Sequence, residues 1–212
     1  FLPWAITEQY AKLKSGFACL RTFEQFGGTP EEIANAQQNL ICVMGVMGHF
    51  VADGAQPLHL TKHYNGWVGP NPRGYSTSRR LHAWIDGGFI AKAGIEVGQL
   101  QPRMRPARRL TTGPASEAGT NLFPVVLQHL QLQAKQVEPL YELDQAGKLS
   151  VEPAVHPEGV AFLSAQLMSG AQMLGDLWLT AWMEAGADKF LEEALKQRQA
   201  SQESSVKKGS QP

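Results

Sequence analysis

The chain has 212 residues, of which 43% are hydrophobic, so it can bury a full core and has the usual length of one domain. Lysine and arginine together number 19, as do aspartate and glutamate, so no net charge favours nucleic acid, a membrane surface or an acidic partner. The longest apolar run, Leu40–Gly48, is too short to span a bilayer. Specificity is therefore expected to come from a local site.

Helical periodicity predicts the first two elements. Apolar residues recur at helical spacing over Trp4–Leu20, and a glycine pair at 27–28 ends that segment. Thr29, followed by Pro30 and two glutamates, is typical of a helix start: an N-cap, a proline at the first position and acids at the positive end of the helix dipole. A second helix is expected to run from there to about Asp53.

The middle of the chain is predicted to be irregular. Glycine, proline, asparagine and aromatic residues dominate 54–77, which indicates a long loop of the kind that carries function. A third helix is expected to begin near Ser78 and to hold His82 and Asp86. Residues 99–112 contain four arginines, two prolines and no acid, which predicts a second exposed connection.

The last third of the chain returns to helical patterns. Segments 122–144 and 159–185 are rich in leucine, methionine and tryptophan, as core helices are. No convincing strand or repeat occurs, so residues 1–196 are predicted to form an all-α, single-domain multi-helix bundle. Residues 197–212 are rich in serine, glutamine and lysine, with Val206 as the one large apolar side chain, and are predicted to be a disordered tail.

The compartment is left open by the sequence. The chain begins Phe1-Leu2-Pro3-Trp4 and shows no signal-peptide pattern. Cys19 and Cys42 lie on two neighbouring predicted helices, where a disulfide and a pair of buried free thiols are equally compatible with the sequence.

Histidine and aspartate spacing points to a metal site. Four of the six histidines fall between residues 49 and 82, and two of them are followed by aspartate four residues later. His49 and Asp53 lie one helical turn apart, as do His82 and Asp86, so each pair can point at one ion from a single helix face. His59 follows a helix-breaking proline, so its imidazole is expected to reach the same place. These ligands suit zinc, and two histidines with one carboxylate leave a position open for water.

Simpler explanations exist for each residue taken alone. One histidine–aspartate pair at this spacing is more often a surface or capping pair. Two pairs flanking a fifth possible ligand are much harder to obtain by chance, and an unpaired Asp53 carboxylate in an apolar segment would be costly. His63 is expected beside the ligands or on the surface. His129 and His156 are interpreted as a hydrogen-bonded core histidine and a loop histidine, and both are excluded from the site.

The string GHFVADGAQPLH at 48–59, followed by LHAWID at 81–86, resembles the motif of the zinc-dependent phospholipase C and single-strand-specific nuclease (3'-nucleotidase) superfamily. That motif is HxxxD, then a histidine six residues later, then HxxxD/E. The resemblance implies an all-α fold that holds three zinc ions. It implies that His59, His82 and Asp86 complete one zinc site, that His49 and Asp53 supply half of another, and that Asp53 bridges to the third ion as a catalytic carboxylate.

The family's remaining ligands come from an N-terminal segment. They are an amino-terminal tryptophan, two histidines and an aspartate, whereas this sequence has no histidine before His49. An N-terminally truncated chain with one complete zinc site is therefore expected, and its own activity is left open. The resemblance also implies that the protein is secreted or periplasmic.

The expected activity is zinc-dependent hydrolysis of phosphodiester bonds by metal-activated water, with nucleic acid as the first substrate class. Tyr64, Trp67 and Tyr75 can stack on bases, and the arginines at 103–109 can meet a phosphate backbone. One alternative is phospholipase C-type cleavage of phospholipid head groups, in which the same aromatic residues face lipid. Another is a catalytically inactive helical module whose single zinc is structural. No stable protein partner is implied.

Overall fold

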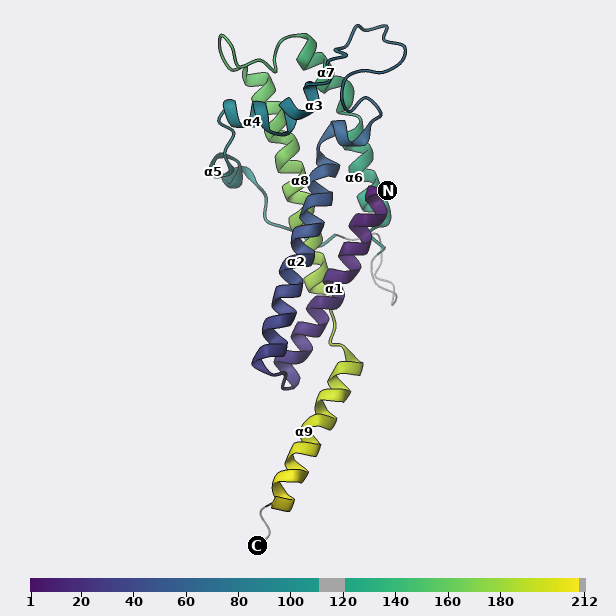
Figure 1. Ribbon diagram of the computed structural model, residues 1–212, viewed down its shortest axis with the longest axis vertical. Coiled ribbons are helices and arrows are strands. Elements are labelled where there is room, and N and C mark those ends of the chain that lie inside the picture. The colour runs from purple at the N-terminus through teal and green to yellow at the C-terminus, as the bar shows by residue number, and fades with distance from the viewer. Residues whose placement is uncertain (111–120, 210–212) are drawn as a thin grey trace.

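The computed structural model describes residues 1–110 and 121–209, with side chains through Ser205. Helices form the regular structure of these residues, and no β-strand occurs among them. In Figure 1 the long helices run roughly along one axis of the molecule, and the shorter elements gather at one end. The predicted all-α, multi-helix fold is confirmed.

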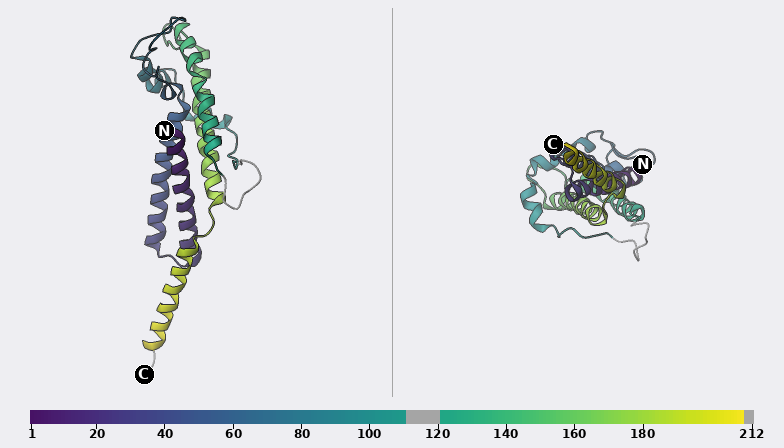
Figure 2. Two further views of the ribbon diagram at one scale, coloured as in Figure 1. Left: turned by 90° about the vertical axis from the view of Figure 1, so that its right-hand side faces the viewer. Right: turned by 90° about the horizontal axis from the view of Figure 1, so that it is seen from below.

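Helices α1 (Leu2–Phe26) and α2 (Pro30–Ala55) form an antiparallel hairpin (Figures 1 and 2). Gly27 ends α1 in the left-handed conformation, with φ of 82°, which glycine adopts without a Cβ penalty. The Thr29 side chain then accepts the N–H of Glu32, and the Glu32 carboxylate accepts the N–H of Thr29. This reciprocal capping box confirms the helix start predicted at Thr29.

Helices α6 (Phe123–Ala134) and α8 (Pro157–Glu184) pack against the hairpin, which lies opposite them in the left-hand view of Figure 2. The sequence predicts one helix over 122–144, but the structure breaks it after Ala134 and begins α7 at Val137–Gln145. Pro139 explains the break. It has no N–H for the carbonyl of Lys135, and its ring crowds that carbonyl.

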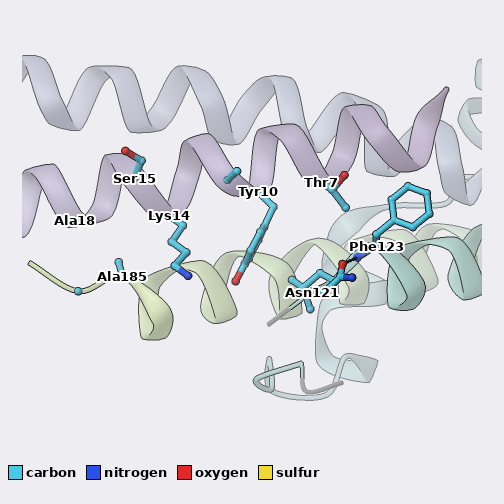
Figure 3. A pocket seen from close by; sticks show the side chains of 11 residues that line it. Thr7, Tyr10, Lys14, Ser15, Ala18, Asn121, Phe123 and Ala185 are labelled. Atoms are coloured by element: carbon cyan, nitrogen blue, oxygen red, sulfur yellow. Dashed lines mark hydrogen bonds between the residues drawn. The ribbon is translucent and has the colours of Figure 1, made fainter. Parts of the chain in front are cut away.

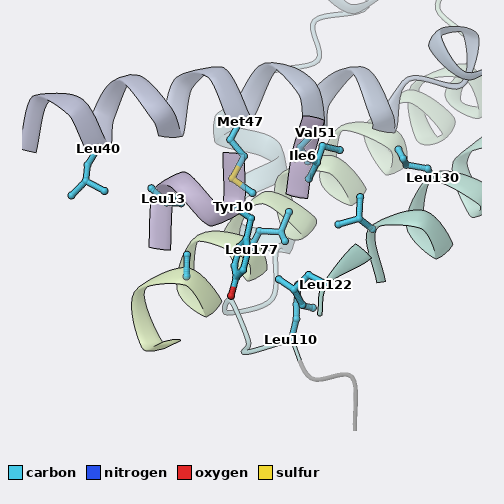
Figure 4. Close-up of a cluster of buried hydrophobic side chains, with 12 residues drawn as sticks. Ile6, Tyr10, Leu13, Leu40, Met47, Val51, Leu110, Leu122, Leu130 and Leu177 are labelled. Atoms are coloured by element: carbon cyan, nitrogen blue, oxygen red, sulfur yellow. The ribbon is translucent and has the colours of Figure 1, made fainter. Parts of the chain in front are cut away.

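Two hydrophobic cores stabilise the molecule. The first joins α1, α2, α6 and α8 (Figure 4) and includes Ile6, Leu13, Met47, Val51 and Leu177. Each such side chain contributes about 1.5–3 kcal/mol when it is fully buried. This core holds α2 against α1, α6 and α8.

The second core lies where α2 ends. It contains Leu58, Ile85, Phe89, Leu140 and Tyr141, all of which are almost completely buried. Leu58 directly precedes a predicted metal ligand, and so does Ile85. The second core therefore anchors two segments that carry the predicted site.

Short elements connect α2 to α6. The long loop predicted at 54–77 is present, although its first part forms a 3₁₀ turn. The predicted third helix begins at Leu81 rather than near Ser78, and a wider π-helical turn interrupts it. In order, the elements are η1 (Pro57–Leu60), α3 (Leu81–Ala83), the π-helical η2 (Trp84–Gly88), α4 (Phe89–Lys92), α5 (Val97–Leu100) and η3 (Gln101–Arg103).

The arginine-rich connection runs along α8 and is held by two acids there. Asp176 Oδ1 accepts the backbone N–H of Arg108 at 2.9 Å, and Glu184 Oε1 accepts from Arg109 Nη2 at 3.0 Å. The side chains of Asp176 and Glu184 are each 5% exposed. The arginine side chains at 103–109 are exposed as predicted, but the backbone at Arg108 is fixed. Residues 111–112 of the predicted connection lie outside the described residues.

Helix α9 (Lys189–Gly209) continues beyond the end of the hairpin (Figure 1). The sequence predicts a disordered tail from Gln197, whereas the structure is helical to Gly209, and residues 210–212 lie outside the described residues. Two side-chain pairs stabilise the helix where this segment begins. Lys196 pairs with Glu192 one turn away, and Arg198 binds the Glu32 carboxylate at 2.8 and 3.0 Å.

Within the described residues, no helix is both long and apolar enough to cross a membrane. Cys19 and Cys42 are free thiols, so the disulfide is absent, but they are not the buried pair that was the alternative, because Cys19 is only partly buried. Burial raises the pKa of Cys19, and the nearby carboxylates of Asp188 and Glu32 add to this effect. Cys42 is exposed.

Candidate metal centre

Four neighbouring elements position the predicted ligands. The last two turns of α2 carry His49 and Asp53, and the helix ends two residues later at Ala55. His59 lies on the 3₁₀ turn η1 that follows directly. His82 lies on α3, and Asp86 lies in the π-helical turn η2.

His59, His82 and Asp86 form one compact group, which we call the metal centre. His59 Nε2 lies 2.8 Å from His82 Nε2, and Asp86 Oδ2 lies 3.5 Å from the first nitrogen and 3.1 Å from the second. Zinc–nitrogen bonds of about 2.0–2.1 Å at a tetrahedral angle place two ligand atoms about 3.3 Å apart. The three atoms thus fit one tetrahedral zinc ion after shifts of a few tenths of an ångström, and they are the ligand types that zinc takes.

Asp53 lies behind His59 rather than within this group. Its Oδ1 is 3.0 Å from His59 Nδ1, and its Oδ2 is 3.4 Å from His49 Nε2. Histidines that bind metals usually donate their other ring N–H to a carboxylate, which fixes the tautomer and orients the ring. Asp53 is placed to accept that hydrogen bond from the Nδ1–H of His59. The five predicted residues thus form one chain of contacts.

His49 lies at the outer end of this chain. Its side chain is 71% exposed, against 25% for His59 and 28% for His82. Asp53 and His49 together offer two ligand groups, which is half of a tetrahedral site. Their direct binding of a metal stays a prediction from the resemblance.

Gln56 is a site residue that sequence reasoning missed. Its Nε2 donates to Asp86 Oδ1 at 2.8 Å, and its Oε1 accepts the N–H of Leu58 at 2.5 Å. The same amide therefore caps the turn that carries His59 and holds one oxygen of Asp86. The signal was its place between the end of a helix and Pro57, where a polar side chain commonly caps the next turn.

The π-helical turn shapes the other side of the centre. The N–H of Phe89 donates to the carbonyl of Trp84, five residues back, so this turn holds one residue more than an α-helical turn. Gly88 makes it possible, because a Cβ there would lie 2.4 Å from the Trp84 ring. Such turns are frequent at functional sites.

Of the other histidines, His63 makes its contacts outside the centre. Its ring stacks on Trp67 with centroids 3.8 Å apart, and its Nδ1 accepts the N–H of Val68. Burial lowers the pKa of His63, and the charge of Lys62 lowers it further.

The two excluded histidines lie away from the centre. His156 is the N-cap residue of α8. Burial lowers the pKa of His129 on α6, but its buried Nε2 has no hydrogen-bond partner among the described residues. The interpretation of His129 as a hydrogen-bonded core histidine is therefore not supported at that nitrogen.

Two hollows differ in their relation to the centre. One of about 380 Å³ lies between α2 and α8 and is lined by Asp53, Gln56, His59 and Asp86 together with aliphatic side chains. Another, of about 450 Å³, lies between α1 and the ends of α6 and α8, and none of the five predicted ligands lines it (Figure 3).

The second hollow is built around a buried tyrosine. The hydroxyl of Tyr10 donates to Glu184 at 2.9 Å, and Lys14 Nζ lies 3.8 Å from the same carboxylate. Burial, together with this bond, raises the pKa of Tyr10 above its ordinary value. These polar groups are engaged with each other, so they are structural in this arrangement.

No family model, curated protein or solved structure matches this chain. The resemblance to the phospholipase C and nuclease superfamily therefore rests on the motif residues alone and stays a prediction.

Proposed function

We propose that this protein is a zinc-dependent phosphodiester hydrolase. The observation that carries the proposal is the convergence of His59, on the turn after α2, with His82 and Asp86, one helical turn apart on the next segment, at separations that suit one tetrahedral ion. Three protein ligands leave the fourth position for water or substrate, as in catalytic zinc sites. Structural sites close with four, so this arrangement disfavours the inactive zinc-binding module.

The residues of the chain have separate roles in this proposal. His59, His82 and Asp86 hold the ion. When bound, zinc lowers the pKa of its water, so that hydroxide forms and attacks phosphorus near neutral pH, and it also polarises a phosphoryl oxygen. Asp53 accepts the Nδ1–H of His59 and keeps Nε2 directed at the ion. Gln56 holds Asp86 by Oδ1, so that Oδ2 faces the two histidines.

The surroundings of the centre disfavour nucleic acid as the first substrate. Trp67 is stacked on His63 and donates to the carbonyl of Pro70, and Tyr75 is 3% exposed. Of the three aromatic residues expected to stack on bases, Tyr64 alone is exposed, and its ring centroid lies 5.9 Å from that of His82. Two of the four arginines, Arg108 and Arg109, are paired with acids of α8.

The hollow beside the centre favours a lipid-like phosphodiester instead. Its lining contains aliphatic side chains from α2, η2, α4 and α8, and the one aromatic ring among its lining residues belongs to His59. Bases bind best where they can stack on aromatic side chains, whereas aliphatic walls suit alkyl chains. The proposal therefore puts a phospholipid-type substrate first and keeps a nuclease activity, supported by Tyr64, as the second candidate.

Zinc content and hydrolysis test the proposal together. Zinc per chain is measured by plasma mass spectrometry after zinc addition and gel filtration, for the wild type, His82→Ala and the control His156→Ala. The same samples are assayed with bis(4-nitrophenyl) phosphate, a short-chain phosphatidylcholine and single-stranded DNA. We expect one zinc ion per chain, lost in His82→Ala and kept in His156→Ala, with hydrolysis following the zinc.

Two results would count against the proposal in different ways. Absence of zinc in the wild type, even after addition, would remove the metal centre itself. Zinc that depends on His82 without hydrolysis of any of the three substrates would instead support the inactive zinc-binding module.

A further inference from the structure

The loop between η1 and α3, residues 61–80, is basic although the chain as a whole carries no net charge. It contains Lys62, Arg73, Arg79 and Arg80, and no aspartate or glutamate. Arg73 lies against α7, where its Nη1 is 2.7 and 3.1 Å from two glutamates. The other three side chains are exposed and form no ion pair with any residue that the structure describes. The basic loop therefore presents three unpaired positive charges to solvent.

Internal hydrogen bonds fix the shape of the basic loop. Trp67 donates its backbone N–H to the carbonyl of Ser76 at 2.9 Å, which joins the two halves of the loop. The amide of Asn71 bonds the backbone of Tyr75 through both of its ends, at 2.7 and 2.9 Å, and the Tyr75 ring is buried. A partner that binds this loop therefore meets a smaller cost of ordering it.

Two apolar side chains of the basic loop are left in solvent. Tyr64 is 53% exposed and Val68 is 48% exposed. Tyrosine is enriched at the interfacial region of membranes, because its ring is apolar and its hydroxyl is polar. Cations beside apolar side chains are the combination that binds an anionic lipid surface, where the cations meet phosphates and the apolar groups leave water.

The basic loop lies at one end of the molecule and next to the metal centre. In Figure 1 and in the left-hand view of Figure 2, it lies at the end opposite α9. Arg80 is the residue before α3, and His82 is the second residue of that helix. The ring centroid of Tyr64 is 5.9 Å from that of His82. A surface that contacts the loop is therefore brought close to the metal centre.

We propose that the basic loop docks the protein on an anionic lipid surface. Lys62, Arg79 and Arg80 meet the lipid phosphates, and Tyr64 and Val68 enter the interfacial region. Single-stranded nucleic acid is also a polyanion, but it binds best to several exposed aromatic rings, and this loop exposes one. The proposal deepens the proposed function and rests on it, because a lipid surface is where a phospholipid-type substrate is found.

Binding to vesicles tests the docking directly. Vesicles of phosphatidylcholine alone are compared with vesicles that contain about one third phosphatidylglycerol, at low and at physiological salt. The protein is kept metal-free in chelator, and the bound fraction is measured by co-sedimentation. Fluorescence anisotropy with a labelled single-stranded oligothymidylate measures binding of nucleic acid under the same conditions.

Two pairs of matched variants locate the contact. The double variant Arg79→Gln/Arg80→Gln removes two charges from the basic loop, and Arg103→Gln/Arg105→Gln removes two exposed charges from the arginine-rich connection. The second pair introduces an acid at an exposed valine: Val68→Asp is in the loop, and Val97→Asp, its control, is on α5. The valine pair leaves every arginine in place, so it tests the loop independently of the first pair.

We expect the wild type to bind the anionic vesicles at least tenfold more tightly than the neutral ones, and to bind less tightly as salt rises. The Arg79/Arg80 variant should lose about 25-fold in affinity, since each cation near an anionic surface contributes about fivefold. Val68→Asp should weaken binding several-fold, because a carboxylate replaces an apolar contact and is repelled by the lipid. The two control variants should bind almost as the wild type does.

Four outcomes would overturn the proposal. They are no binding to anionic vesicles, equal binding to both kinds of vesicle, equal losses in the two double variants, and tighter binding of the oligothymidylate that the Arg79/Arg80 variant abolishes. The vesicle assay uses neither metal nor turnover. A protein that docks as expected but hydrolyses no substrate with zinc would therefore contradict the proposed function and leave the docking loop standing.

Discussion

The amide of Gln56 lies between the turn that carries His59 and the carboxylate of Asp86. It donates to Asp86 Oδ1 at 2.8 Å, while the other oxygen, Oδ2, lies 3.1 Å from His82 Nε2. Because Leu58 also donates to this amide, both of its ends are fixed. The other oxygen of Asp86 is thereby left facing the two histidines, and the two segments of the centre are tied together.

Replacing Gln56 by leucine should weaken zinc binding about tenfold, since groups that orient metal ligands typically account for 10–100-fold in affinity. Competition with a chromogenic chelator measures this directly. Gln38→Leu, on the exposed face of α2, is the matched control and should bind zinc as the wild type does. Unchanged affinity in Gln56→Leu would show that Asp86 needs no such support.

Gly88→Ala should destabilise the fold by about 1–3 kcal/mol, the usual cost of overpacking. The new Cβ would lie 2.4 Å from the ring of Trp84, and that ring is held because its Nε1 donates to the carbonyl of Leu149. The neighbouring Gly87 has no atom within 4 Å of an added Cβ, so Gly87→Ala should be neutral or slightly stabilising. Urea unfolding of the two variants separates a packing effect from a general loss of glycine.

Acid should loosen the contact of α9 with the hairpin. The hydrogen bond from Arg198, aided by the backbone N–H of Thr29, lowers the pKa of Glu32 from 4.5 to about 2. In the unfolded chain the pKa returns to its ordinary value. The stabilisation is therefore complete above about pH 4.5 and is lost as the pH falls towards 2.

Hydrogen exchange of α9 against pH measures this loss. Wild type and Glu32→Gln should differ in protection of α9 near pH 6 and converge towards pH 2. The pair is partly exposed, so the difference should be small and should shrink with added salt. A difference that is constant with pH would rule out Glu32 as its cause.

Asp176→Ala should release the arginine-rich connection from α8. The carboxylate accepts the N–H of Arg108 and the amide of Gln172, both at 2.9 Å, and the variant leaves these donors without it. We expect a loss of about 2–3 kcal/mol, since hydrogen bonds to charged groups contribute about 1.5–3 kcal/mol. Trypsin should then cleave at the arginines of 103–109 faster than in the wild type. Gln172→Leu keeps the carboxylate and should leave the cleavage rate nearly unchanged.

Most of the helices could be predicted because their signals are local. The start of α2 depends on Thr29 and the residues just after it, and the capping box forms among those same residues. The break at Lys135 was missed because the apolar pattern continues across it, although Pro139 marks it. The helical end of α9 was missed because polar composition hides the pairs that Arg198 makes with the hairpin.

The candidate site was only partly readable from the sequence. The spacing of His82 and Asp86 predicts their proximity, and the structure brings His59 to them. The partner of Gln56 is 30 residues away, so nothing local announces the bond to Asp86. The hollow beside the metal centre depends on how α2 packs against α8. The packing of helices so far apart in the sequence cannot be read from local patterns.

The wider turn Trp84–Gly88 also limits which substitutions and deletions this segment can accept. Each residue of an α-helix advances the chain by about 100°, so the extra residue alters the rotational phase of everything after it. Asp86 must face His82 while Phe89, three residues on, must face the core. If one glycine were deleted here, either Asp86 would turn away from His82 or Phe89 would turn away from the core. Gly87 in this stretch has room for a side chain, but the stretch has no room for a change of length, so its spacing must be kept as a unit.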